Sequence, residues 1–228
     1  MDERALRELG LLEVARWYEV GGGPATSAPA PAITTEAAEH AARGADWDRL
    51  RQLVADCRAC GLCKQRKQAV FGVGAEAGPW LFVGEGPGAD EDEQGEPFVG
   101  QAGKLLDNML AAIGCRRGED TYIANVVKCR PPGNRTPTAE EAGACAPFLD
   151  RQIELVAPKL IVALGKSAVV RLLGTDASVA SLRGRVHRYR GIPVVVTYHP
   201  AYLLRSLPEK AKAWEDLVFA RRTLRGVG

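Results

Sequence analysis

The chain is organised around residues 83–103, which read Val83-Gly-Glu-Gly-Pro-Gly-Ala-Asp-Glu-Asp-Glu-Gln-Gly-Glu-Pro-Phe-Val-Gly-Gln-Ala-Gly103. They follow the apolar run 80–83, which predicts a buried strand, and precede 104–113, whose apolar spacing predicts a helix. The stretch is therefore a long loop at the carboxyl end of a strand, where open α/β sheets bind ligands. Its glycines let backbone approach a bound group, and its carboxylates favour acid–base chemistry over phosphate binding. A flexible acidic surface loop is the alternative.

Length and composition indicate one sizeable globular domain with appendages. The chain has 228 residues, of which 46% are hydrophobic and 25% charged, and its net charge is +2. A surface for nucleic acid must therefore be a local patch. No apolar run is long enough for a membrane span, and the N-terminus lacks the features of a signal peptide. We expect a cytoplasmic protein without a membrane partner.

Buried runs alternate with helical segments along the chain. Strands are expected at 121–127, 159–164, 186–189 and 193–197, and helices at 36–56, 138–156, 167–173 and 209–225. This alternation predicts an α/β fold, a three-layer α/β/α sandwich with a mainly parallel central sheet.

The N-terminal segment is expected to be an appendage. Residues 1–20 predict an amphipathic helix, over 2–19, and residues 21–35 a flexible Gly/Pro/Ala linker before the domain at 36–228. The helix could dock on the domain itself, on a protein partner or on a second copy. Docking on the domain without a separate role is the simplest of these.

Six cysteines without an export signal indicate metal ligands or free thiols rather than disulfides. The close pair and the two distant positions suit a metal centre that ties two loops together, on Cys57, Cys60, Cys129 and Cys145. Cys63 is a rival ligand, and Cys115 is expected to be a separate thiol. The absence of nearby histidines argues against a mixed zinc site, but zinc, iron–sulfur and unconnected buried thiols all stay open.

Three blocks carry a resemblance to a known family. They are Gly84-Glu-Gly-Pro-Gly88 with Glu91-Asp92 and Gly95-Glu-Pro-Phe-Val-Gly100, then Asn125-Val-Val-Lys-Cys-Arg-Pro-Pro132 with Asn134-Arg-Thr-Pro137, and His199-Pro-Ala-Tyr-Leu-Leu-Arg205. In this order, and with the cysteine pattern, they resemble the family 4 uracil-DNA glycosylases, the iron–sulfur type of that superfamily. The likeness spans residues 55–225 and leaves out the N-terminal segment.

The resemblance implies a structural [4Fe–4S] cluster on the four cysteines named above, with Cys63 as a bystander. It implies hydrolysis of the bond between uracil and deoxyribose in flipped-out deoxyuridine, which leaves an abasic site for base excision repair. The partner would be uracil-containing DNA, and the enzyme would be a monomer of the bacterial cytosol or nucleoid.

The resemblance also implies roles for single residues. His199 would donate to uracil O2, and Glu85 and Glu91 would orient water or stabilise a cationic sugar, with Glu91 also crowding a thymine methyl. Phe98 would stack on uracil, and Asn125 would pair with its N3–H and O4. Backbone N–H groups of the first loop would add donors. The implied uracil-binding set is Gly84, Glu85, Gly86, Pro87, Phe98, Asn125 and His199.

DNA contacts are implied beside the pocket. An apolar tip formed by Tyr202 and Leu203 would fill the gap left by the flipped base, and Arg130, Arg135 and Arg205 would contact phosphates. The segment 130–144 holds no histidine, whereas a related branch is trapped on its product through one. We therefore expect repeated turnover.

Two other functions compete with the glycosylase. One is a non-catalytic, cluster-stabilised module that binds DNA or recruits a partner, and the other is a small redox protein. Retention of Glu85, Phe98, Asn125 and His199 together argues against the module, because a mere binder does not need that set. A redox protein would need an exposed cluster and a partner site, and the Pro-rich loop at Cys129 gives no sign of either.

Overall fold

The computed structural model of the protein describes residues 35–226, in which one six-stranded sheet forms the centre. The order across the sheet is β1-β3-β2-β4-β6-β5. The four central strands are parallel, and both edge strands are antiparallel to their neighbours. The bounds are β1 (Val73–Gly74), β2 (Trp80–Gly84), β3 (Thr121–Asn125), β4 (Leu160–Leu164), β5 (Val186–Tyr189) and β6 (Ile192–Thr197). The predicted mainly parallel sheet is confirmed.

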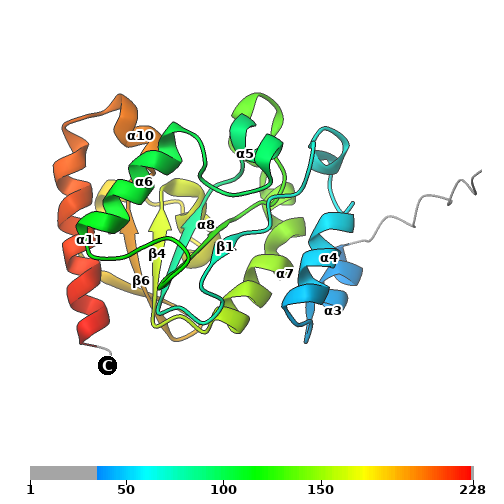
Figure 1. The fold of residues 1–228 in the computed structure, drawn as a ribbon, viewed down its shortest axis with the longest axis horizontal. Coiled ribbons are helices and arrows are strands. Elements are labelled where there is room, and N and C mark those ends of the chain that lie inside the picture. Colours follow the sequence, from blue (N-terminus) through cyan, green and yellow to red (C-terminus); the bar gives the residue numbers. More distant parts are fainter. Residues whose placement is uncertain (1–34, 227–228) are drawn as a thin grey trace, which may run out of the picture. The chain divides into compact units, whose positions relative to one another are not determined.

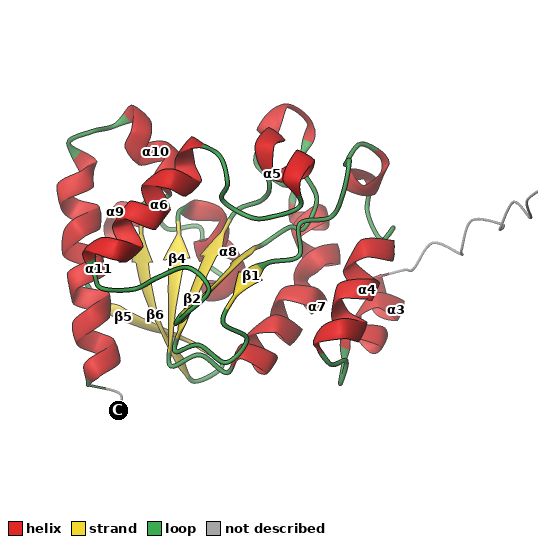
Figure 2. Cartoon of the chain, in the orientation of Figure 1, coloured by secondary structure: helices red, strands yellow, loops and turns green. Residues whose placement is uncertain are grey.

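Helices cover both faces of this sheet (Figures 1 and 2). The α-helices are α3 (Thr35–Ala42), α4 (Trp47–Asp56), α5 (Ala89–Gln94), α6 (Gln101–Ala112), α7 (Ala139–Val156), α8 (Lys166–Leu173), α9 (Val179–Leu182), α10 (Pro200–Arg205) and α11 (Glu209–Arg225). Two short 3-10 helices, η1 (Gly61–Lys64) and η2 (Pro132–Asn134), lie in loops. The predicted three-layer sandwich is therefore confirmed.

Alternating side chains of the central strands build two separate cores. Leu81 and Val83 of β2 pack with α4, α7 and α8, whereas Trp80 and Phe82 pack with α6, α10 and α11. Successive residues of a strand point to opposite faces, so a strand between two helical layers needs apolar residues at every position. All five residues of β2, β3 and β4 are accordingly buried.

Two predicted elements differ from the structure. The single helix expected at 36–56 is broken into α3 and α4, because Gly44 takes a left-handed φ of 78° and Asp46 caps the new helix by accepting from Arg49 N at 2.9 Å. The acidic loop contains the short helix α5, which begins at Ala89. The helix α7 begins as predicted at Thr138, which forms a capping box with Glu141.

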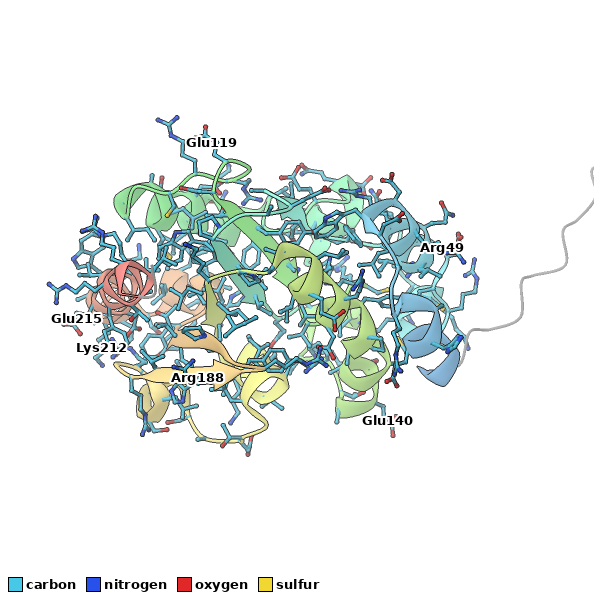
Figure 3. The ribbon with its side chains drawn as sticks, turned by 90° about the horizontal axis from the view of Figure 1, so that it is seen from below. Arg49, Glu119, Glu140, Arg188, Lys212 and Glu215 are labelled. Carbon is cyan, nitrogen blue, oxygen red and sulfur yellow. The ribbon has the colours of Figure 1, made fainter. Side chains whose placement is uncertain are left out.

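The surface of the described part carries charges of both signs. Figure 3 labels charged side chains that project outward from the fold, namely Arg49, Glu119, Glu140, Arg188, Lys212 and Glu215. None of the helices within 35–226 is both long and apolar enough to cross a membrane. The chain divides into units 1–32 and 33–228. The predicted N-terminal helix at 1–20 and the linker at 21–35 lie outside the described residues, except for Thr35, which begins α3.

Candidate active site and cysteine centre

The carboxyl ends of the parallel strands meet at one edge of the sheet, where α5, α6 and α10 also lie (Figure 1). β2 and β3 end in register, with Gly84 opposite Asn125. A pocket of about 320 Å³ opens at this edge. Its walls bring together three loops that are distant in sequence, through Glu85, Gly86, Pro87, Gly88, Ala89, Asp90, Glu91, Phe98, Gly100, Ala102, Asn125, Pro131, Asn134, Arg135, His199 and Ala201.

His199 follows β6 and caps α10, which fixes the state of its ring. Its Nδ1 accepts a hydrogen bond from Ala201 N at 3.2 Å, so the proton of the neutral ring lies on Nε2. Burial, and to a lesser extent the positive charge of Arg205, lower the pKa of His199 to about 4, while Glu91 opposes the shift. The ring stacks on Phe98 with centroids 5.5 Å apart. At neutral pH the site therefore holds an uncharged imidazole with one N–H to donate.

Asn125 ends β3 as a buried polar side chain, only 2% exposed. Its Oδ1 has no hydrogen-bond partner, which is costly for a buried acceptor unless a ligand supplies the donor. Gly84 makes room for this amide, because a Cβ there would lie 2.5 Å from both Asn125 Oδ1 and Phe98 Cζ. The pocket therefore presents an acceptor that is positioned but unpaired.

Phe98 is held in a strained backbone conformation. Its φ of 56° is unfavourable for a bulky residue. The Arg117 guanidinium donates to Phe98 O at 2.8 Å, and Gly103 leaves space for that same oxygen, since a Cβ there would lie 1.7 Å from it. These contacts set the direction in which the aromatic ring enters the pocket.

The two candidate carboxylates are bound differently. Glu91 accepts three backbone hydrogen bonds, from Gly88 N at 2.9 Å and from Val99 N and Gly100 N at 3.0 Å each. Its oxygens thus join the start of α5 to the turn after Phe98. Glu85 accepts one side-chain hydrogen bond, from the Ser167 hydroxyl, and is half-buried in the pocket wall.

The cysteines of the predicted centre converge at a second place, away from this pocket. Cys57, Cys60, Cys129 and Cys145 line one small cavity, and Cys63 lines it too, so the structure does not separate the rival ligand from the other four. Cys115 lies elsewhere, in the core beneath α6 and α11, as expected. Burial raises the pKa of Cys129 to about 11 and that of Cys145 to about 12, so neither is a reactive free thiol.

Two cations support this cysteine centre. Arg66 donates to Cys129 Sγ at 2.9 Å and to Cys57 O at 3.1 Å, and Lys128, which is 1% exposed, donates from its backbone N to Cys145 Sγ at 3.3 Å. Within residues 35–226, no three His, Cys, Asp or Glu side chains are close enough to hold a single metal ion. Several cysteines around one cavity, flanked by positive charge, have the donor chemistry that an anionic iron–sulfur cluster requires.

Comparison with known proteins identifies the family. The model of the uracil DNA glycosylase superfamily matches residues 71–218. Type-4 uracil-DNA glycosylases of Pyrobaculum aerophilum and Thermotoga maritima are 44% and 45% identical over 180 and 179 residues, which cover 75% and 77% of this chain and 91% and 93% of theirs. The one from Archaeoglobus fulgidus is 46% identical over 165 residues, 69% of this chain and 82% of its own. The chain belongs to the type-4 uracil-DNA glycosylases. The resemblance carried by the three sequence blocks is thereby confirmed.

One predicted DNA contact of this type-4 chain needs correction. Leu203 was expected at an exposed apolar tip, but it is 1% exposed and packs in the core with residues of α6 and α11. It lies on the inner side of α10, whereas Tyr202 and Leu204 are 39% and 41% exposed. Within α10, the exposed large apolar side chains are therefore those of Tyr202 and Leu204.

The three arginines predicted to contact DNA lie in different surroundings. Arg130 donates to Asn134 Oδ1 at 2.7 Å, and Arg135 binds both carboxylate oxygens of Glu141, at 2.6 and 2.8 Å. Arg135 lines the pocket. Arg205 is exposed, and its charge influences His199.

Three residues that the sequence analysis did not identify contact the site residues, although they lie far from them in sequence. Ser167 binds Glu85 across 82 positions of sequence, and Arg66 binds Cys129 across 63. Arg117 reaches Phe98 from the turn before β3. None lies in a recognisable motif, and a single sequence carries no signal for such pairs.

We predict that Gly103→Ala lowers uracil release by about 100-fold, because the new Cβ displaces Phe98 O and with it the ring by roughly 1 Å. Gly143→Ala is the matched control, since it is also a helical glycine but has open space around it. It should keep full activity and raise the free energy of unfolding by up to about 1 kcal/mol. Single-turnover release rates and thermal unfolding measure both effects, and equal release by the two variants would contradict the clamp on Phe98.

We also predict that the ring of His199 titrates with a midpoint near pH 4 rather than 6.5, since burial lowers its pKa to about 4. The unfolded chain then binds more protons than the folded one between these values, so this group's stabilising contribution is complete above about pH 6.5 and is lost as the pH falls towards 4. NMR of ring-labelled protein, with His199→Gln to assign the signal, measures the midpoint. A midpoint above 6 would refute the neutral, buried ring.

Proposed function

We infer that this chain hydrolyses the N-glycosidic bond of deoxyuridine in DNA, releasing uracil and leaving an abasic site. One observation carries the inference. A single pocket holds the unpaired Oδ1 of Asn125 and the neutral, Nε2-protonated ring of His199. Similar proteins bear the name type-4 uracil-DNA glycosylase.

Asn125 is proposed to read the base. Its Oδ1 accepts the N3–H of uracil and its amide donates to O4, whereas cytosine presents the reverse pattern at both atoms. A wrong base leaves buried groups unpaired, at about 1–3 kcal/mol each. Since the pocket lies inside the protein, the nucleotide has to rotate out of the stack before it can be read.

His199 is proposed to stabilise the leaving group. As the bond from C1′ to N1 breaks, its electron pair stays on uracil and spreads to O2. The Nε2–H donates to that oxygen, which holds more charge in the transition state than before it. The neutral ring gives this donor without needing a proton from solvent. Backbone N–H groups of Glu85 and Gly86 and the ring of Phe98 complete the proposed uracil-binding surface, which Pro87 also lines. Gly84 leaves room behind it for Asn125 and Phe98.

Glu85 is the proposed water-orienting carboxylate. A water oxygen forms the new bond to C1′ as one of its protons passes to Glu85, and the carboxylate also favours positive charge on the sugar. Glu91 is less suited to this step because its oxygens already accept three backbone hydrogen bonds. We propose that it fixes the loop and narrows the pocket instead.

DNA contacts are proposed around the pocket mouth. Arg205, Arg130 and Arg135 would bind phosphates, with Arg135 exchanging one partner oxygen of Glu141 for DNA. The exposed Tyr202 and Leu204 would hold the gap in the stack. Binding by these arginines should weaken with salt.

A structural [4Fe–4S] cluster on Cys57, Cys60, Cys129 and Cys145 is proposed for the cysteine centre. When bound, it would supply iron–thiolate bonds that join the segment after α4 to the loop after β3 and to α7. Glycosidic hydrolysis itself transfers no electrons. The monomeric state, the cytoplasmic location and a partner for the helix at 2–19 stay predictions.

The activity is tested by uracil release from a labelled U·G duplex. The wild type should release uracil over several turnovers, and His199→Ala should lower the rate by about 100- to 1000-fold, as loss of one donor to a developing anion does. His187→Ala is a suitable control, because His187 lies on the edge strand β5. If the wild type released no uracil from any uracil-containing DNA, the glycosylase activity would be refuted and a non-catalytic DNA-binding module would be favoured.

The cluster is tested by iron and sulfide analysis of anaerobically purified protein. We expect about four irons per chain in the wild type and in Cys115→Ala, and loss of most iron in Cys145→Ala. Cys63→Ala should keep its iron if it is a bystander. Zinc in place of iron, or iron lost only in Cys63→Ala, would overturn the ligand set.

A further inference from the structure

We propose that the β4–α8 turn, residues 165–167, positions both reacting groups of the site, and that Ser167 is the positioning residue that orients the Glu85 carboxylate. The inference rests on the proposed function of Glu85. Ser167 does not line the pocket, so its effect on the reaction passes through Glu85.

Without the hydrogen bond from Ser167, the Glu85 side chain would be free to rotate. Glu85 is the first residue after β2, and its main chain is fixed because its carbonyl accepts from Val127 N at 3.1 Å. Its side chain has three rotatable bonds and one side-chain hydrogen bond, the one donated by the Ser167 hydroxyl to Oε2. That bond leaves the other oxygen, Oε1, to accept from a water molecule in the pocket.

The donor, the Ser167 hydroxyl, is attached to rigid backbone. Ser167 is the second residue of α8, and the following Ala168 and Val169 are fully buried. The neighbouring Lys166 turns away to Asp176, at 2.7 Å, so it does not compete for Glu85. The hydroxyl is thus carried by backbone that the core holds in place.

The same turn is also joined to the segment that carries His199, through Gly165. Gly165 N donates to Thr197 O at 2.9 Å, which ties the turn to the end of β6, two residues before the histidine. Gly165 has a left-handed φ of 83°, and a Cβ there would lie 2.9 Å from His199 Cβ. The turn at 165–167 therefore sets the distance between the Glu85 carboxylate, which receives the water proton, and the His199 ring, which stabilises uracil.

The proposal is tested with Ser167→Ala and Ser167→Thr. We expect Ser167→Ala to lower the single-turnover rate of uracil release by about 10- to 100-fold, the usual effect of a lost hydrogen bond to a charged group, with little change in DNA affinity. Ser167→Thr keeps the hydroxyl and should restore most of the rate. Ser178→Ala, which removes a helix cap on the neighbouring α9, is the control for stability and should release uracil normally.

A double-mutant cycle separates positioning from a structural role. In a Glu85→Gln background, Ser167→Ala should have almost no further effect, because its carboxylate partner is already absent. Independent, multiplicative effects would overturn the proposal, as would a loss of DNA binding at unchanged rate. A wild type that releases no uracil would instead refute the proposed function, and so the two failures are distinguishable.

Discussion

Parallel pairing of the four central strands is the constraint on which the site depends. Because β3, β2, β4 and β6 run in the same direction, the residues that follow them emerge at one edge of the sheet. Asn125, Glu85, the turn at 165–167 and His199 come from four different strands. A strand that ran in the opposite direction would carry its residue to the other edge of the sheet, away from the remaining three. The burial of every residue in β2, β3 and β4 holds that pairing in place.

The site itself is built by restricting side chains that would otherwise move. The Phe98 backbone is held in an unfavourable conformation by Arg117, and the glycines at 84 and 103 remove the atoms that would collide with it. The His199 tautomer is chosen by a backbone N–H of its own helix. Such fixed donors and acceptors need not reorganise as charge develops on uracil, and catalysis by electrostatic stabilisation depends on that.

Motifs and alternating apolar runs were sufficient to predict the layers, the central strands and the pocket residues, because each is encoded within a few neighbouring positions. The break at Gly44 was missed, since apolar spacing continues across it. The placement of Leu203 was wrong for a related reason. Its position in a motif does not tell which side of α10 faces the core, and only packing against α6 and α11 decides this. The supporting contacts of Ser167 and Arg66 connect segments that only the folded sheet brings together.

The cysteine centre and the pocket share one short segment of chain, residues 125–129. Lys128 lies between Asn125 and Cys129, with its backbone N on Cys145 Sγ and its Nζ on Asn125 O, at 2.9 Å. Gln152 of α7 binds the same Nζ at 2.6 Å. Lys128 therefore joins the cysteine centre to the end of β3, the strand that carries Asn125, through its backbone N and its side chain.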